Sequence, residues 1–143
     1  MHFVQGMPDL ASFTAQQLVM PLCVIDITSK VKENVDYEVV PQDIIDWEAK
    51  YGRMPEGVFV AIRTDWHKRE DLNNYDDKEQ KHYPGWGLES LKFLVEQRNV
   101  GAIGHETSDV VRYRSRLDNG RRCRADCECG RQTSTVELLS INL

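Results

Sequence analysis

The sequence has no long apolar run. None of its segments approaches the roughly eighteen apolar residues that a membrane-spanning helix needs, although 41% of its 143 residues are hydrophobic. Its first ten residues contain neither a basic region nor an apolar h-region, so no signal peptide is predicted. These absences predict a cytoplasmic protein with no membrane partner. The length suits one globular domain with its own core.

The sequence also lacks an excess of positive charge, since its net charge is −5. General nucleic-acid-binding proteins are usually basic, so no nucleic acid is expected as a partner. The charge is unevenly distributed, because residues 1–109 carry 11 basic and 19 acidic residues. Residues 110–143 carry seven Arg and four acidic residues. The composition therefore changes near residue 110.

Apolar runs alternate with helical patterns before that break. Three apolar segments, residues 19–28, 58–63 and 100–103, are predicted to be buried strands. Residues 42–51 and 88–97 are predicted to be helices. Pro41 and Gly52 flank the first helix in the positions that usually mark a helix start and end. This order of elements predicts an α/β domain.

The remaining segments are predicted to be irregular. Residues 67–82 are strongly charged and are predicted to form a solvated loop or lid, in which only Leu72 and Tyr75 could pack. Residues 84–87 are predicted to be a turn. Residues 110–135 have few apolar residues and no period, and residues 136–143 recover a core-like apolar run.

Three cysteines fall inside the irregular segment. Cys123, Cys127 and Cys129 have the spacing C-x₃-C-x-C. Closely spaced thiolates can bind zinc, but a structural site normally has four ligands. A second interpretation is that this Arg- and Cys-rich segment arises from out-of-frame translation. The nucleotide sequence would separate the two interpretations.

A polar cluster follows the third predicted strand. His105 and Glu106 come directly after an apolar run, and open α/β sheets bind ligands at the carboxyl ends of their strands. Adjacent side chains on an extended segment point to opposite faces. Either one of the two lines a substrate pocket while the other anchors the loop, or both brace the strand end through hydrogen bonds. Trp66 is predicted to be a pocket wall or a core residue, while His67 and His82 are expected to be solvated.

Several segments together resemble the cyclase family of metal-dependent hydrolases, which includes bacterial kynurenine formamidase and isatin hydrolase. The segments that carry the resemblance are His2-Phe3, residues 22–26, residues 58–66, Tyr83-Pro84-Gly85 and residues 101–109. The resemblance implies a single swivelling β/β/α domain over residues 1–143. Residues 2–109 and 136–143 are similar to the family, and residues 110–135 are anomalous.

The resemblance implies roles for two residues, one through the family's N-terminal motif H-x-G-T-H-x-D-x-P-x-H and one through a C-terminal segment. Its last His acts as an acid or base, and His2 matches it, so the resemblance makes His2 a catalytic residue and the chain incomplete at its N-terminus. Glu137 lies in a segment similar to the family's C-terminal metal-binding Glu, which makes it a candidate metal ligand. The implied cofactor is a divalent metal, zinc or manganese.

The resemblance implies hydrolysis of an amide-like bond in a small-molecule substrate, such as the formamide of N-formylkynurenine, with His105, Glu106 and Trp66 at the substrate pocket. It also suggests a homo-oligomer. The alternative is a non-catalytic fragment, partner subunit or regulatory module that retains the fold. If an N-terminal segment is absent, Val24, Ile25 and Val60 are expected to be left bare.

Overall fold

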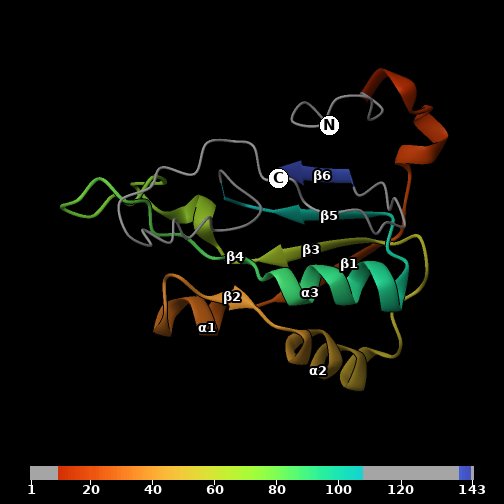
Figure 1. The fold of residues 1–143 in the computed structure, drawn as a ribbon, viewed down its shortest axis with the longest axis horizontal. Coiled ribbons are helices and arrows are strands. Elements are labelled where there is room, and N and C mark those ends of the chain that lie inside the picture. The colour runs from red at the N-terminus through yellow and green to blue at the C-terminus, as the bar shows by residue number, and fades with distance from the viewer. Residues whose placement is uncertain (1–9, 108–138, 143) are drawn as a thin grey trace, which may run out of the picture.

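The computed structural model describes residues 10–107 and 139–142, and its centre is a four-stranded parallel sheet (Figure 1). The strand order is β1–β3–β5–β6. The bounds are β1 (Leu22–Asp26), β3 (Phe59–Arg63), β5 (Ala102–His105) and β6 (Leu139–Asn142). Because every neighbouring pair is parallel, the carboxyl ends of all four strands lie at the same edge of the sheet.

A small second sheet and three α-helices accompany the main sheet. The small sheet pairs β2 (Glu38–Val39) with β4 (Gly85–Trp86) in parallel. The α-helices are α1 (Thr28–Glu33), α2 (Pro41–Tyr51) and α3 (Leu88–Lys92), and α3 continues into the π-helical turn η4 (Phe93–Gln97). The short 3₁₀ turns are η1 (Leu10–Ser12), η2 (Ala15–Leu18) and η3 (Trp66–Lys68). Helices α2 and α3 lie on the same side of the main sheet (Figure 1).

Local sequence explains where α2 begins and ends. The carboxylate of Asp43 accepts a hydrogen bond of 2.8 Å from the amide of Val40, which satisfies a donor at the helix start. Pro41 occupies the first turn, where its missing N–H costs nothing. The helix ends at Gly52, whose φ of 93° is strained for residues with a Cβ. The indole of Trp47 then ties α2 to the edge strand β1 by donating to the carbonyl of Val24.

The hydrophobic core lies between the main sheet and the helices. Alternate residues of the strands face this side, and Ile25, Val60 and Ile103 are all buried in one cluster with Ile44 of α2 and Leu94 of η4. The expectation that Ile25 and Val60 would be bare is therefore wrong, because both face the helices.

The opposite side of β1 differs from this core side. Leu22 and Val24 alternate with the buried residues of β1, and they are 58% and 42% exposed. The expectation that apolar strand surface would be left bare is therefore correct for Val24.

Most predicted elements are present. The predicted strands at 19–28 and 58–63 contain β1 and β3, and the one at 100–103 overlaps β5, which begins and ends two residues later. The two predicted helices match α2 and the α3–η4 pair. The predicted turn at residues 84–87 is wrong in part, because Gly85 and Trp86 form β4. Leu72 and Tyr75 do not pack, since both are more than half exposed. The predicted irregular segment 110–135 lies outside the described residues.

The length and polarity of the described helices can be compared with what a membrane-spanning helix needs. Within residues 10–107 and 139–142, every helix is too short or too polar to cross a membrane.

Candidate functional site

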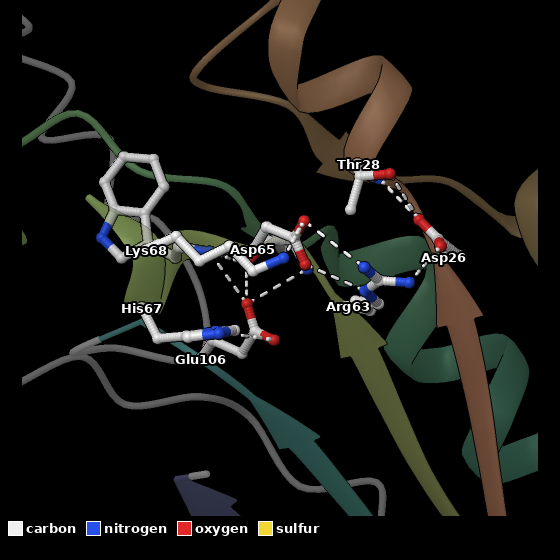
Figure 2. A network of polar contacts seen from close by, with 9 residues as sticks. Asp26, Thr28, Arg63, Asp65, His67, Lys68 and Glu106 are labelled. Carbon is white, nitrogen blue, oxygen red and sulfur yellow. Dashed lines mark hydrogen bonds and ion pairs between the residues drawn. The ribbon is translucent and has the colours of Figure 1, made fainter.

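Polar side chains collect at the carboxyl ends of β1, β3 and β5. Asp26 and Arg63 are the last residues of β1 and β3, which pair with each other, and Glu106 directly follows the last residue of β5 (Figure 2). Strand order therefore brings together residues that are far apart in the sequence. This edge is where open α/β sheets bind ligands.

The β1 end of the network is built around Asp26. Its carboxylate accepts hydrogen bonds from the hydroxyl of Thr28 at 2.7 Å and from the amide of Thr28 at 3.0 Å, which fixes the start of α1. Its other oxygen lies 3.2 Å from a guanidinium nitrogen of Arg63. These contacts stabilise the charged form, so the pKa of Asp26 lies below its ordinary value, mainly because of Thr28.

Asp65 carries the second carboxylate of the network and follows β3. It pairs with Lys68 at 2.8 Å and with the Nε of Arg63 at 2.9 Å (Figure 2). The two cations, Lys68 first, lower the pKa of Asp65 to about 2. Its φ of 58° is in the left-handed region, which is uncommon for a residue other than Gly and frequent at functional sites.

Glu106 holds the ends of β3 and β5 together. Its Oε2 accepts three hydrogen bonds: 2.6 Å from the hydroxyl of Thr64, 3.2 Å from the amide of Thr64 and 2.9 Å from the amide of Trp66. The side chain is only 12% exposed. Both donor residues follow β3, so this carboxylate acts as a clamp across two neighbouring strands (Figure 2).

The second oxygen of Glu106 faces a histidine. Its Oε1 lies 3.5 Å from the Nδ1 of His67, and the His67 side chain is 60% exposed. The sequence predicted a solvated His67, and exposure confirms that part. Its contact with Glu106 was missed, because the two residues meet only through the pairing of β3 with β5. A histidine just beyond the end of a predicted central strand was the available indication.

His105 is buried at the end of β5. It is the last residue of β5, and its Nδ1 lies 3.2 Å from the hydroxyl of Thr107. That hydroxyl also donates to the carbonyl of Pro84 at 3.3 Å. His105 and Glu106 therefore both hold hydrogen bonds at the strand end. Their placement in a substrate pocket stays a prediction.

Trp66 lies against a small pocket. A cavity of about 160 Å³ is lined by Trp66 and Arg69 on one side and by Thr28 and Lys32 of α1 on the other. Trp66 is only 2% exposed, its indole donates to the carbonyl of Leu72, and Arg69 stacks over its ring at 4.5 Å. The ring is thus mainly a core residue that contributes one edge to the pocket.

A larger cavity lies at the outer edge of β1. It has a volume of about 270 Å³ and is lined by β1, Lys30 and residues of α2 such as Asp43 and Trp47. Asp43 is nearly buried, and its carboxylate accepts hydrogen bonds from Lys30 and Tyr37. His105 and Glu106 line neither of these two cavities.

His82 corrects one sequence expectation. Its Nδ1 lies 2.7 Å from Asp36 and its Nε2 lies 3.4 Å from Asp76. This partly buried histidine, predicted to be solvated, therefore ties the end of the charged loop to the turn before β2.

The predicted catalytic residue and the candidate metal ligands are not among these groups. His2 and Glu137 lie outside the described residues, as do the three cysteines of the C-x₃-C-x-C cluster. Among the residues that the structure does describe, no three His, Cys, Asp or Glu side chains are grouped so that they could hold a metal ion.

The fold and the polar edge together define an α/β protein of the type that binds ligands at its strand ends. The Cyclase family model matches residues 1–110, so the chain belongs to the cyclase family. This confirms the family and the fold class that the sequence motifs predicted.

The relatives found include isatin hydrolases. Isatin hydrolase of Roseibium aggregatum is 30% identical over 107 residues, which is 70% of this chain and 41% of the relative. The structure of isatin hydrolase A from Labrenzia aggregata bound to benzyl benzoate is 40% identical, with a TM-score of 0.64, and the match covers 67% of this chain and 38% of that chain. Isatin hydrolase A from Ralstonia solanacearum is 34% identical, with a TM-score of 0.63 and the same coverage. The chain thus spans about two fifths of the length of these relatives.

Proposed function

We propose that this chain acts in the hydrolysis of an aryl amide C–N bond in a small molecule. The observation that carries the proposal is the polar network at the carboxyl ends of β1, β3 and β5, in a cyclase-family chain similar to isatin hydrolases. Isatin is a cyclic aryl amide, and N-formylkynurenine carries an open-chain aryl formamide. In both substrates, water adds to a carbonyl carbon whose amide nitrogen is attached to a benzene ring.

The described residues support two tasks in such a reaction. The Glu106 clamp holds the loop after β3 in a fixed position, which limits movement of groups at the strand ends. The small pocket combines the edge of the Trp66 ring with Arg69 and Lys32, and these cations suit the carboxylate that amide hydrolysis releases. The network also carries Arg63, whose guanidinium is half exposed.

The proposed cofactor is zinc or manganese, because the family resemblance implies a divalent metal. The described residues do not by themselves fit such a metal, because no three suitable side chains converge among them. Glu137 stays its proposed protein ligand, and His2 stays the proposed acid or base.

A second candidate is a non-catalytic module that retains the fold and binds a partner. The observation that favours it is that no three His, Cys, Asp or Glu side chains among the described residues are grouped so that they could hold a metal ion.

The hydrolase and the non-catalytic module make different predictions about substrate turnover by this chain. The purified chain is incubated with isatin or N-formylkynurenine, each with and without Zn²⁺ or Mn²⁺, and ring opening or deformylation is followed by absorbance. Bound metal is measured by elemental analysis. The hydrolase proposal predicts metal-dependent turnover of at least one substrate. It predicts that His2→Asn lowers kcat by about 100-fold or more, whereas Lys50→Gln, an exposed change in α2, leaves kcat unchanged. Absence of turnover with both substrates at full metal loading would favour the non-catalytic module.

A further inference from the structure

We propose that His67 and Glu106 form a carboxylate–imidazole pair in which His67 takes up and returns a proton during hydrolysis, and Glu106 is its positioning residue. The inference rests on the proposed function. It assigns a second proton-accepting residue in addition to His2, whose catalytic role rests on the family resemblance alone.

The geometry of Glu106 supports a positioning role. Its Oε2 is held by three donors from Thr64 and Trp66, so the carboxylate plane cannot turn freely. That leaves Oε1 directed toward the Nδ1 of His67 at 3.5 Å (Figure 2). Catalytic hydrogen bonds are often long in the free protein and shorten when substrate binds. The carboxylate is nearly buried, whereas the imidazole is mostly exposed.

This arrangement selects one form of the imidazole. A carboxylate only accepts hydrogen bonds, so neutral His67 carries its proton on Nδ1 when it contacts Glu106. Its Nε2 then has a free lone pair. The other charged groups nearby are Arg63, Asp65 and Lys68, and Asp65 pairs with both of these cations. Both cations thus pair with Asp65, although the charge of Glu106 also acts on Arg63.

The proton transfers balance without another reactant. Water adds to the amide carbonyl carbon and gives a proton to the Nε2 of His67. The C–N bond then breaks, and the same proton moves to the leaving nitrogen, which returns His67 to its neutral form. The reaction consumes one water and yields a carboxylic acid and an amine.

The first test reads the tautomer of His67 by long-range ¹H–¹⁵N NMR of the imidazole rings. At about pH 9 an ordinary imidazole is neutral, and the His67 signals are assigned by their loss in His67→Gln. The wild type is expected to show mainly the Nδ1–H form. Glu106→Gln keeps an oxygen for the donors of Thr64 and Trp66 and turns its NH₂ toward His67, so the Nε2–H form should predominate. The same tautomer ratio in both proteins would overturn the pairing.

The second test measures kcat/KM with the better substrate. His67→Gln is expected to lower kcat/KM by about 100-fold, while the matched change His82→Gln at the loop contact leaves it within about twofold. If the wild type turns over and His67→Gln retains full kcat/KM, this inference is wrong and the proposed function stands. If the wild type shows no turnover, the proposed hydrolysis is contradicted. Proton transfer by His67 during that hydrolysis is then contradicted as well. The tautomer measurement still decides whether the pair forms.

Discussion

The Glu106 clamp gives a stability prediction whose size follows from the structure. Replacing Glu106 with Ala removes the acceptor of three hydrogen bonds, from the hydroxyl and amide of Thr64 and the amide of Trp66. A hydrogen bond to a charged group contributes about 1.5–3 kcal/mol, and a buried donor left without a partner costs about 1–3 kcal/mol. The three bonds share one oxygen, so their contributions do not add fully.

We therefore expect Glu106→Ala to lower the free energy of unfolding by about 3 kcal/mol, a large share of the 5–15 kcal/mol typical of a domain. Urea denaturation followed by tryptophan fluorescence measures this change, since Trp66 lies at the clamp. Glu106→Gln keeps one carbonyl oxygen for the same donors and should cost about 1 kcal/mol or less.

The exposed partner supplies the control. His67→Ala removes the contact at Oε1 but leaves the clamp intact, and exposed ion pairs contribute roughly 0–1 kcal/mol. A loss below about 1 kcal/mol for Glu106→Ala, similar to that of His67→Ala, would refute the conclusion that this carboxylate holds the two strand ends together.

Two further predictions concern the packing that supports the site. Glu48 accepts two hydrogen bonds from Arg98, at 2.7 and 2.8 Å, and its pKa lies below its ordinary value because of Arg98. The stabilisation is therefore present above the ordinary carboxyl pKa and is lost as pH falls through the lower folded-state pKa. Glu48→Gln should cost about 1–2 kcal/mol at pH 7, and denaturation across pH should show this difference closing below about pH 4; a constant difference would contradict the ionic contribution. A Cβ at Gly104 would lie 2.6 Å from the Phe59 ring, so Gly104→Ala should cost about 1–3 kcal/mol in the same assay, and an unchanged midpoint would show that the ring moves aside freely.

Regular elements with strong local patterns could be predicted from the sequence. The runs that form β1, β3 and β5 are apolar, and α2 is flanked by Pro41 and Gly52. Strands β2 and β4 were missed because each has two residues, and their pairing depends on contacts between distant segments, such as the amide of Gly85 with the carbonyl of Tyr37. Helix α1 was missed because Val31 is its one buried residue and its start is fixed by Asp26.

The candidate site was only partly predictable for the same reason. His105 and Glu106 could be found, since they come directly after an apolar run in the sequence. The choice between lining a pocket and bracing the strand end needed the partners of Glu106, which lie about 40 residues earlier in the chain. The one local indication for His67 is its place just beyond a predicted central strand, and its contact with Glu106 is found only when β3 and β5 are seen to be neighbours.

The carboxyl ends of β1, β3 and β5 are the proposed site. The most direct measurement is a ¹H–¹⁵N NMR titration of the chain with the ring-opened carboxylate that hydrolysis of isatin produces. Saturable shifts are expected for the amides of Thr64, Trp66, His67 and Glu106, while the amide of Gly57, before the opposite end of β3, stays unchanged. Shifts centred on α2, or no saturable shift at the strand ends, would contradict the proposed site.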